Sequence, residues 1–303
     1  MTQKQSIYRK YLDPKVISHL ATLDLRARMV VEGFIAGLHK SPYHGFSVEF
    51  SEHRQYMPGD DFKHIDWKVY GKTDRFFVKQ YEEETNLKAY LLIDASASMV
   101  YSSHEVNKFQ YATYLAAALT YLMLRQRDAV GLVTFDEKIR KILPARSVST
   151  YLPLILAELE KTQTAHGTAI VPMLHEIAER IKRRSLIMLF SDLYDENTHG
   201  LMQGLKHFRH RKHEVIVFHI LDPLEVSFDF KQDAIFEDLE TRAKISTQPI
   251  HIRREYQRLM GEFIQTLKKG CRENNIDYVN LTTTTPFDLA LVQYLQKRKR
   301  LGG

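Results

Sequence analysis

The pattern of apolar and polar residues becomes regular at about residue 87. From there, short apolar runs alternate with stretches whose apolar residues recur every three or four positions, which is typical of buried strands alternating with amphipathic helices. We expect strands at 89–93, 129–135, 186–190, 215–218 and 276–281, and helices at 108–125, 150–161, 169–183, after 197, at 250–274 and at 286–297. Because such an alternation builds a parallel sheet covered on both faces, the sequence predicts an α/β, doubly wound fold with a mostly parallel sheet flanked by helices.

Two segments interrupt this alternation. Residues 138–143 directly follow the second strand and are predicted to pair with it as an edge hairpin. In residues 224–250, Val226, Phe228 and Phe230 alternate with polar residues, which predicts an inserted hairpin.

The first 86 residues have a different pattern and form a predicted N-terminal extension. Asp13-Pro14 favours the start of a helix, and apolar residues at helical spacing continue it to about residue 38. Alternating residues then predict strands at 46–50 and 75–84, separated by a charged segment with turn signals. We therefore divide the chain into an extension, residues 1–86, and an α/β domain, residues 87–303.

Composition narrows the class of protein. Of the 303 residues, 44% are hydrophobic and 26% are charged, as in ordinary globular proteins. The single cysteine, Cys271, excludes an internal disulfide and any site with several thiolates, and it fits a reducing compartment. The polar N-terminus and the absence of any run near the roughly 20 apolar residues that cross a bilayer predict a cytoplasmic protein without a transmembrane segment.

The charge balance is mildly basic. Lys and Arg number 43 and Asp and Glu 37, which gives a net charge of +6. Part of the excess lies in the tail, residues 297–300, which we expect to be a solvated terminus. Peripheral contact of this tail with a membrane stays open, but charge does not predict a nucleic-acid-binding protein.

Oxygen-bearing side chains follow two of the predicted strands. Asp94 comes directly after the first strand and Asp192 after the third, while Ser96 and Ser98 continue the Asp94 loop. Ligands of parallel sheets bind beyond the carboxyl ends of the strands, so these side chains are expected at one rim. Hard oxygen donors suit Mg²⁺ first, with Mn²⁺ or Ca²⁺ as alternatives. Asp and Ser are also favoured at helix N-caps, but the convergence of several loops favours a metal site.

These loops resemble the metal-ion-dependent adhesion site of von Willebrand factor A domains. The resemblance is carried by Asp94-Ala-Ser96-Ala-Ser98, His166-Gly167-Thr168 and Ser191-Asp192. It implies one Mg²⁺, with Ser96 and Ser98 as direct ligands, Thr168 as a ligand in the occupied state, and Asp94 and Asp192 acting directly or through water. Two departures from the pattern are the alanines at 95 and 97 and Leu193, which stands where a glycine is common.

A second resemblance covers residues 46–99. Phe50, Arg54-x-Tyr56-x-Pro58-Gly59-Asp60-Asp61, Ile65-Asp66-Trp67 and Phe77 to Glu84 are similar to the bacterial domain-of-unknown-function family fifty-eight. That family is associated with MoxR-type AAA+ ATPases, which implies an adaptor or co-chaperone. The residues of this segment that stand out have either a partner-binding or a structural role, and the turn at Pro58-Gly59 favours the structural one. They are Arg54, Asp60, Asp61, Asp66 and Trp67.

The sequence thus predicts a non-enzymatic, metal-dependent protein-binding module. Its partner would present an Asp or Glu to the cation and would be a MoxR-type AAA+ ATPase or its client. The alternative is a Mg²⁺-dependent phosphohydrolase that uses Asp94 and Asp192, with a second metal on Asp60, Asp61 or Asp66, but no bridging carboxylate is evident. ATP binding by Gly71-Lys72-Thr73 is excluded, because the first glycine of a phosphate-binding loop is missing.

Overall fold

The computed structural model describes residues 13–38, 53–55, 70–71, 77–79, 87–164, 167, 169–195, 197–232, 234–239 and 243–301. Its centre is a six-stranded sheet in the order β10-β7-β6-β3-β4-β5. The strands are β3 (Lys88–Asp94), β4 (Ala129–Phe135), β5 (Ile139–Arg146), β6 (Leu186–Ser191), β7 (Glu214–Leu221) and β10 (Asp277–Thr282). All neighbours are parallel except β5, which pairs antiparallel with β4 at the edge. The predicted α/β fold with a mostly parallel sheet and an antiparallel edge strand is confirmed.

The order of the strands is that of a doubly wound sheet. From β3 the chain winds outward through β4 to β5, and then returns to β6 and winds the other way through β7 to β10. The change of direction lies between β3 and β6, which pair from Ala89–Leu186 to Ile93–Phe190. Ligands of such sheets bind at this switch point, beyond the carboxyl ends of the strands.

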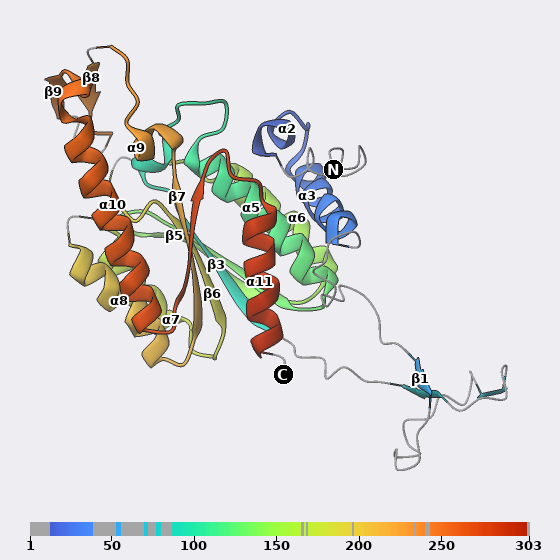
Figure 1. Ribbon diagram of the computed structural model, residues 1–303. Coiled ribbons are helices and arrows are strands. Elements are labelled where there is room, and N and C mark those ends of the chain that lie inside the picture. The colour runs from blue at the N-terminus through green and yellow to red at the C-terminus, as the bar shows by residue number, and fades with distance from the viewer. Residues whose placement is uncertain are drawn as a thin grey trace.

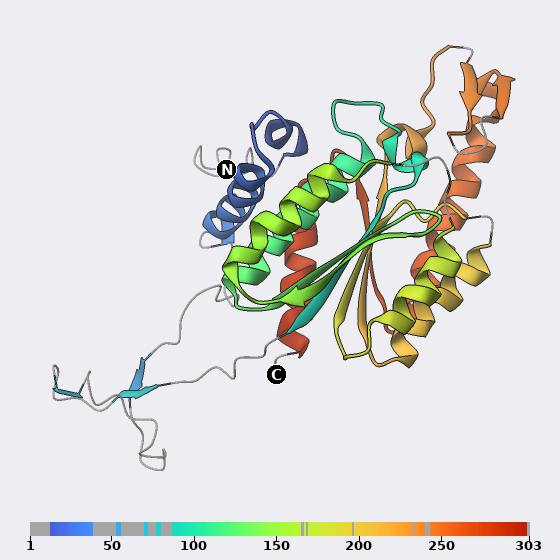
Figure 2. The same cartoon turned by 180° about the vertical axis from the view of Figure 1, so that it is seen from behind.

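Helices cover both faces of the sheet (Figures 1 and 2). One face carries α5 (Lys108–Arg125), α6 (Leu152–Lys161) and α11 (Asp288–Leu301), and the other carries α7 (Ile170–Arg180), α8 (Thr198–His210) and α10 (Pro249–Glu273). Side chains of a strand alternate between the faces, so Leu91 and Ile93 of β3 enter one core and Leu92 enters the other. The two apolar layers hold the ends of β3 and β6 in fixed positions.

Helix α5 begins at the predicted residue, because two reciprocal hydrogen bonds cap its first turn. The Asn107 side chain accepts the N–H of Gln110, and the Gln110 side chain accepts the N–H of Asn107. Both orphan donors are thereby satisfied, which is the physical basis of a capping box. The cap fixes Lys108 as the first residue of the helix, next to the loop that follows β3.

The N-terminal segment forms two helices where one was predicted. Helix α2 (Pro14–Ser18) ends before a break, and α3 (Leu23–Leu38) starts after Thr22, whose hydroxyl accepts the N–H of Leu25. The guanidinium of Arg26 spans the break by donating to the carbonyls of Ser18 and Leu20. Helix α3 packs against α5, and its buried face joins the core on that side of the sheet.

Two hairpins lie outside the main sheet. Strands β1 (His53–Gln55) and β2 (Phe77–Lys79) pair antiparallel; β2 was expected, but β1 falls in the segment for which only turns were predicted. The strand expected at 46–50 lies outside the described residues. After α9 (Pro223–Ser227), strands β8 (Ala234–Glu237) and β9 (Lys244–Thr247) form an antiparallel hairpin where an insertion was predicted. Figure 1 shows this hairpin beside the start of α10, at the carboxyl end of the sheet.

The basic tail is bound to the fold, contrary to the expectation of a solvated terminus. Lys297 is nearly buried and pairs with Glu214 and Asp277 at 2.8 and 3.1 Å. Arg298 pairs with the buried Asp128 at 2.7 Å, and Arg300 lies 3.6 Å from Asp277. Three of the four basic residues of the tail therefore pair with acids of other elements that pack beside α11. Within the described ranges, the structure contains no helix long and apolar enough to cross a membrane.

Candidate metal-binding site

The candidate site lies at the switch point of the sheet. Asp94 is the last residue of β3, and Ser191 is the last residue of the neighbouring β6, with Asp192 directly after it. The loop after β3 is fixed by the N–H of Ala95, which donates to the carbonyl of Phe135 at the end of β4 at 2.8 Å. Three adjacent strands therefore determine where these side chains point.

Hydrogen bonds bring the oxygen atoms of the two loops together. The N–H of Ser96 donates to Asp94 Oδ1 at 2.9 Å, and Ser191 Oγ donates to Asp94 Oδ2 at 2.6 Å. The hydroxyls of Ser96 and Ser98 lie 3.0 Å apart. Each carboxylate oxygen has a second lone pair, so Asp94 can still accept a bond from a metal-bound water.

Electrostatics make this cluster short of positive charge. Burial, followed by the nearby charge of Asp192, raises the pKa of Asp94 to about 6, although hydrogen bonds from Ser191 and Ser96 act in the opposite direction. Both carboxylates are almost completely buried, at 1% exposure each. Two buried carboxylates repel each other, and a cation between them would relieve the repulsion.

Sequence reasoning missed a buried lysine that faces Asp192. Lys108 Nζ lies 2.7 Å from Asp192 Oδ2 and 2.6 Å from Glu225 Oε1, and its side chain is fully buried. Burial by itself would lower the pKa of this ammonium, but the charges of Asp192 and Glu225 outweigh burial and the pKa is raised. The only signal in the sequence is a basic residue at the start of an amphipathic helix, where acidic residues are usual.

The loop after β6 explains why leucine can replace glycine. Leu193 has φ 56°, in the left-handed region, which costs a non-glycine residue roughly 1–2 kcal/mol. Its N–H donates to Ser191 Oγ at 2.9 Å, and its side chain is fully buried in the core beneath the loop. Buried apolar area offsets the backbone strain, and the strained turn directs Asp192 toward Lys108.

A buried histidine supports the same loop from below. His219 Nε2 donates to the backbone carbonyl of Asp192 at 2.8 Å, and Nδ1 accepts from the hydroxyl of Tyr278. Burial lowers the pKa of His219 to about 4, so the ring is neutral at physiological pH. The histidine therefore positions Asp192 without adding positive charge to the site.

The remaining predicted residues are only partly described. Thr168 lies outside the described residues, but Gly167 next to it is described. A Cβ at Gly167 would come within 1.7 Å of Glu137 Oε1, so the Glu137 carboxylate lies against this loop. Arg54 stands on β1 opposite Val78. Asp60, Asp61, Asp66 and Trp67 are also outside the described residues, and so are the acids that would hold the second metal of a phosphohydrolase.

The donor set fits a hard cation bound through hydroxyls and two carboxylates. Among the described residues, no group of three or more His, Cys, Asp or Glu side chains could hold a metal ion. A zinc-type site is thus not offered there, whereas Asp94, Ser96, Ser98 and Asp192 present the oxygen donors that Mg²⁺ prefers.

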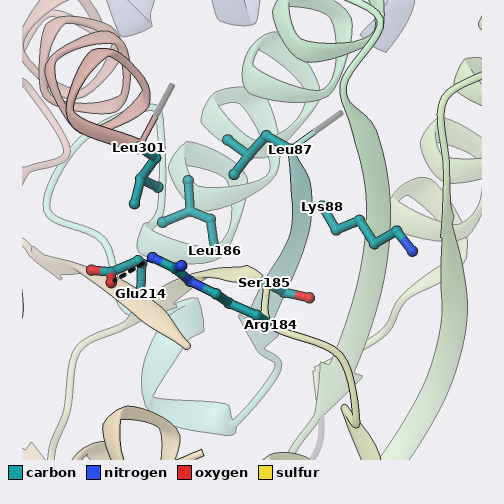
Figure 3. A pocket seen from close by; sticks show the side chains of 7 residues that line it. All are labelled: Leu87, Lys88, Arg184, Ser185, Leu186, Glu214 and Leu301. Atoms are coloured by element: carbon teal, nitrogen blue, oxygen red, sulfur yellow. Dashed lines mark ion pairs between the residues drawn. The ribbon is translucent and has the colours of Figure 1, made fainter. Parts of the chain in front are cut away.

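A small hollow at the other end of the sheet is unrelated to this cluster. It has a volume of about 220 Å³ and is lined by residues at the amino ends of β3, β6 and β7 and at the end of α11. Figure 3 shows the Arg184 guanidinium reaching across it toward Glu214, with an N···O distance of 3.7 Å. The rest of the lining contains no predicted site residue and consists of Leu87, Lys88, Ser185, Leu186 and Leu301.

The chain is similar to uncharacterized proteins and to several solved α/β structures. Uncharacterized proteins of Mycobacterium bovis and Mycobacterium tuberculosis are 24% identical over 295 residues, covering 95% of this chain and 91% of each relative. Crystal structures with a similar chain path include BatB from Bacteroides thetaiotaomicron, with a TM-score of 0.47 and 16% identity over 71% of this chain and 99% of that one. The vWF domain of the type V pili tip protein Mfa5 from Porphyromonas gingivalis has a TM-score of 0.35 and 11% identity over 72% and 96%.

The family model described as "Protein of unknown function DUF58" matches residues 52–263. This range includes the β1–β2 hairpin, the loops that end in Asp94 and Asp192, Lys108 and the first part of α10. The chain belongs to the DUF58 family.

Proposed function

We propose that this chain is a metal-dependent protein-binding module. Asp94, Ser96, Ser98, Thr168 and Asp192 would hold one Mg²⁺, with Mn²⁺ or Ca²⁺ as alternatives. The observation that carries the proposal is the pair of buried carboxylates beside two hydroxyls at the switch point of the sheet. When bound, the cation would offer a coordination position to a carboxylate from a partner protein.

The surrounding residues favour binding over catalysis. Ser96 N–H and Ser191 Oγ hold both oxygens of Asp94, and Lys108 holds one oxygen of Asp192. These carboxylates are therefore oriented and partly neutralised, which suits the retention of a cation more than the activation of a nucleophile. A serine nucleophile requires a positioned base. The Ser96 hydroxyl contacts the Ser98 hydroxyl, which is not a base, so this contact does not activate Ser96 as a nucleophile.

The proposed partner is a MoxR-type AAA+ ATPase or its client, and the proposed setting is the cytoplasm. This step rests on the resemblance of residues 46–99 to a family that works with such ATPases. In that role the chain would act as an adaptor or co-chaperone, and an Asp or Glu of the partner would complete the shell of the cation. A charge-assisted bond of this kind is both strong and directional.

Two measurements test the proposal. Titration calorimetry with Mg²⁺ should give binding to the wild type that Asp94→Ala and Ser96→Ala each weaken at least about tenfold, or about 1.4 kcal/mol. Ser149→Ala, at an exposed serine elsewhere in the chain, is the matched control and should bind as the wild type does. Capture of the AAA+ ATPase from the native cell should require Mg²⁺ and should be lost in EDTA.

Either of two results would overturn the proposal. If Asp94→Ala and Ser96→Ala leave both Mg²⁺ affinity and capture of the ATPase unchanged, the loops do not form the binding site. If the purified chain hydrolyses a phosphate ester with turnover that disappears in Asp94→Ala, the phosphohydrolase is the correct function instead.

A further inference from the structure

A groove of about 870 Å³ begins at the candidate metal loop and runs toward the inserted hairpin. Its lining starts with Ser98, crosses α9 and the residues that follow β8, and ends on α10. Figure 1 shows these elements together at the carboxyl end of the sheet. A partner segment that leaves the metal site in this direction would lie in the groove.

The groove is acidic, although the chain as a whole carries a net charge of +6. The acids in its lining are Asp195, Glu225, Glu237 and Asp238. None of the described residues that line the groove is basic. All four acids have partners within the chain, among them Lys108 at 2.6 Å from Glu225, Lys244 at 3.3 Å from Glu237 and the N–H of Asn197, which donates to Asp195 Oδ1 at 2.7 Å.

Two aromatic residues of the groove contact a lysine of the chain itself. The Lys108 ammonium lies 5.0 Å from the centre of the Tyr194 ring and 6.0 Å from that of Tyr101, both within the range of a cation–π contact. Both rings also line the groove. Burial, and then the charges of Asp222 and Glu225, raises the pKa of Tyr101 to about 12, as expected where the potential is negative.

An apolar shelf adjoins the acids. Leu259 of α10 lines the groove, is 52% exposed and lies on the same helix as the partly buried Tyr256 and Phe263, which also line the groove. Tyr256, one turn earlier, is held in place by stacking on Phe228 at 4.1 Å between ring centres. Carboxylates, ring faces and an aliphatic surface together match a lysine or arginine side chain, whose charged head needs acids and whose stem needs apolar contact.

We propose that this groove binds a lysine or arginine side chain of the same partner segment whose carboxylate reaches the metal site. The proposal rests on the proposed function for the acidic half of the motif and on the groove for the basic half. The recognised segment would thus contain an acid followed or preceded by a base within a few residues. Complementary charges at two points fix the direction of the segment, which a single carboxylate on a cation does not.

Selection from random twelve-residue peptides displayed on phage tests this proposal with the full-length chain in Mg²⁺. The wild type should enrich peptides that combine an acid with Lys or Arg. The double variant Asp195→Asn and Asp238→Asn should bind the selected peptides about tenfold more weakly and lose the enrichment for bases, because it removes two charges from the groove. Its Mg²⁺ affinity, measured separately, should stay within about twofold of the wild type.

The matched control changes acids on α10 that do not line the groove. Glu255→Gln with Glu262→Gln also removes two negative charges, but from exposed positions beside Arg258, and peptide binding should remain as in the wild type. Leu259→Ser should weaken the peptides, whereas Ile252→Ser, at an exposed residue of the same helix outside the lining, should not.

The outcomes separate the two proposals. Basic peptides that bind without Mg²⁺ and are lost in the Asp195 and Asp238 variant support the groove and count against the metal site. Acidic peptides that need Mg²⁺ but show no preference for a base, and bind the double variant equally well, overturn the groove proposal and leave the metal site standing. A selection in which bases are not enriched, including one that yields no binder, also overturns the groove proposal.

Discussion

Two buried lysines at opposite ends of the sheet have the same kind of contacts but different surroundings. Lys108, at the carboxyl end, contacts Asp192 and Glu225, and Lys297, at the amino end, contacts Glu214 and Asp277. All four N···O distances lie between 2.6 and 3.1 Å. A buried ion pair by itself therefore does not indicate a functional site.

The balance of charge distinguishes the two ends. At the amino end, Glu214 is also held by Arg209 at 2.6 Å, and Arg300 lies 3.6 Å from Asp277, so bases outnumber acids. At the carboxyl end, Lys108 faces two carboxylates, and the buried Asp94 adds a third that raises the local negative charge. The acids at the amino end are fully compensated by bases, whereas the carboxyl end has more acids than bases.

The largest expected effect comes from removing the lysine at the carboxyl end. Lys108→Met leaves Asp192 and Glu225 buried without their base, and we expect a loss of about 3–5 kcal/mol in the free energy of unfolding without Mg²⁺. At one fixed Mg²⁺ concentration, this variant should gain about 2–3 kcal/mol more than the wild type gains, because a cation that replaces the ammonium should bind about a hundredfold more tightly. Urea denaturation with and without Mg²⁺ measures both. A loss that Mg²⁺ does not reduce would contradict the excess of negative charge at this end.

The corresponding substitution at the amino end should cost less stability. Lys297→Met removes a nearly buried base, but Arg209 and Arg300 still face its two acids, so we expect a smaller loss of about 2 kcal/mol. Mg²⁺ should not restore it beyond the stabilisation of the wild type. Equal rescue of both variants in the same denaturation experiment would show that Mg²⁺ acts without regard to the site.

Neutralising Asp94 should affect stability in the opposite direction. The folded-state pKa of about 6 lies above the unfolded value of 3.8, so stability falls as pH rises from about 3.8 to about 6, and the full cost of the ionised carboxylate is present above pH 6. Asp94→Asn should therefore stabilise the metal-free chain by about 1–2 kcal/mol at pH 8 and have little effect below pH 4. Unfolding at both pH values checks this. A variant that is less stable at pH 8 would mean that Asp94 is well compensated without a cation.

The smallest expected effect concerns the buried histidine beneath the Asp192 loop. Because the folded-state pKa of His219 is about 4 and the unfolded value 6.5, the unfolded chain binds the proton first as pH falls. The histidine's contribution is present above pH 6.5 and is lost toward pH 4, so lowering the pH from 7 to 5.5 should cost about 1 kcal/mol. His219→Gln should reduce this pH dependence. An unchanged slope in the variant would assign the effect to other groups, such as His213, whose pKa is also lowered by burial.

Much of the fold could be predicted because strands and helices leave local signals. The apolar runs located all six strands of the main sheet, and α5 begins and ends at the predicted residues, since its capping box is a local pattern. The break between α2 and α3 was missed, because Arg26 stabilises it through carbonyls six and eight residues earlier. Strand β1 was missed because its three residues carry no apolar alternation.

Local sequence patterns were enough to predict which oxygen donors follow β3 and β6, and the parallel sheet then required Asp94, Ser96, Ser98 and Asp192 to lie at one rim. Their role in metal binding stays a prediction. Only the tertiary structure placed Lys108 against Asp192 and Glu225, which are 84 and 117 residues away along the chain. Charge compensation and the shape of the groove depend on such distant contacts. Local hydrophobic patterns encode which face of an element is buried, but they do not encode which charged groups meet once two elements pack.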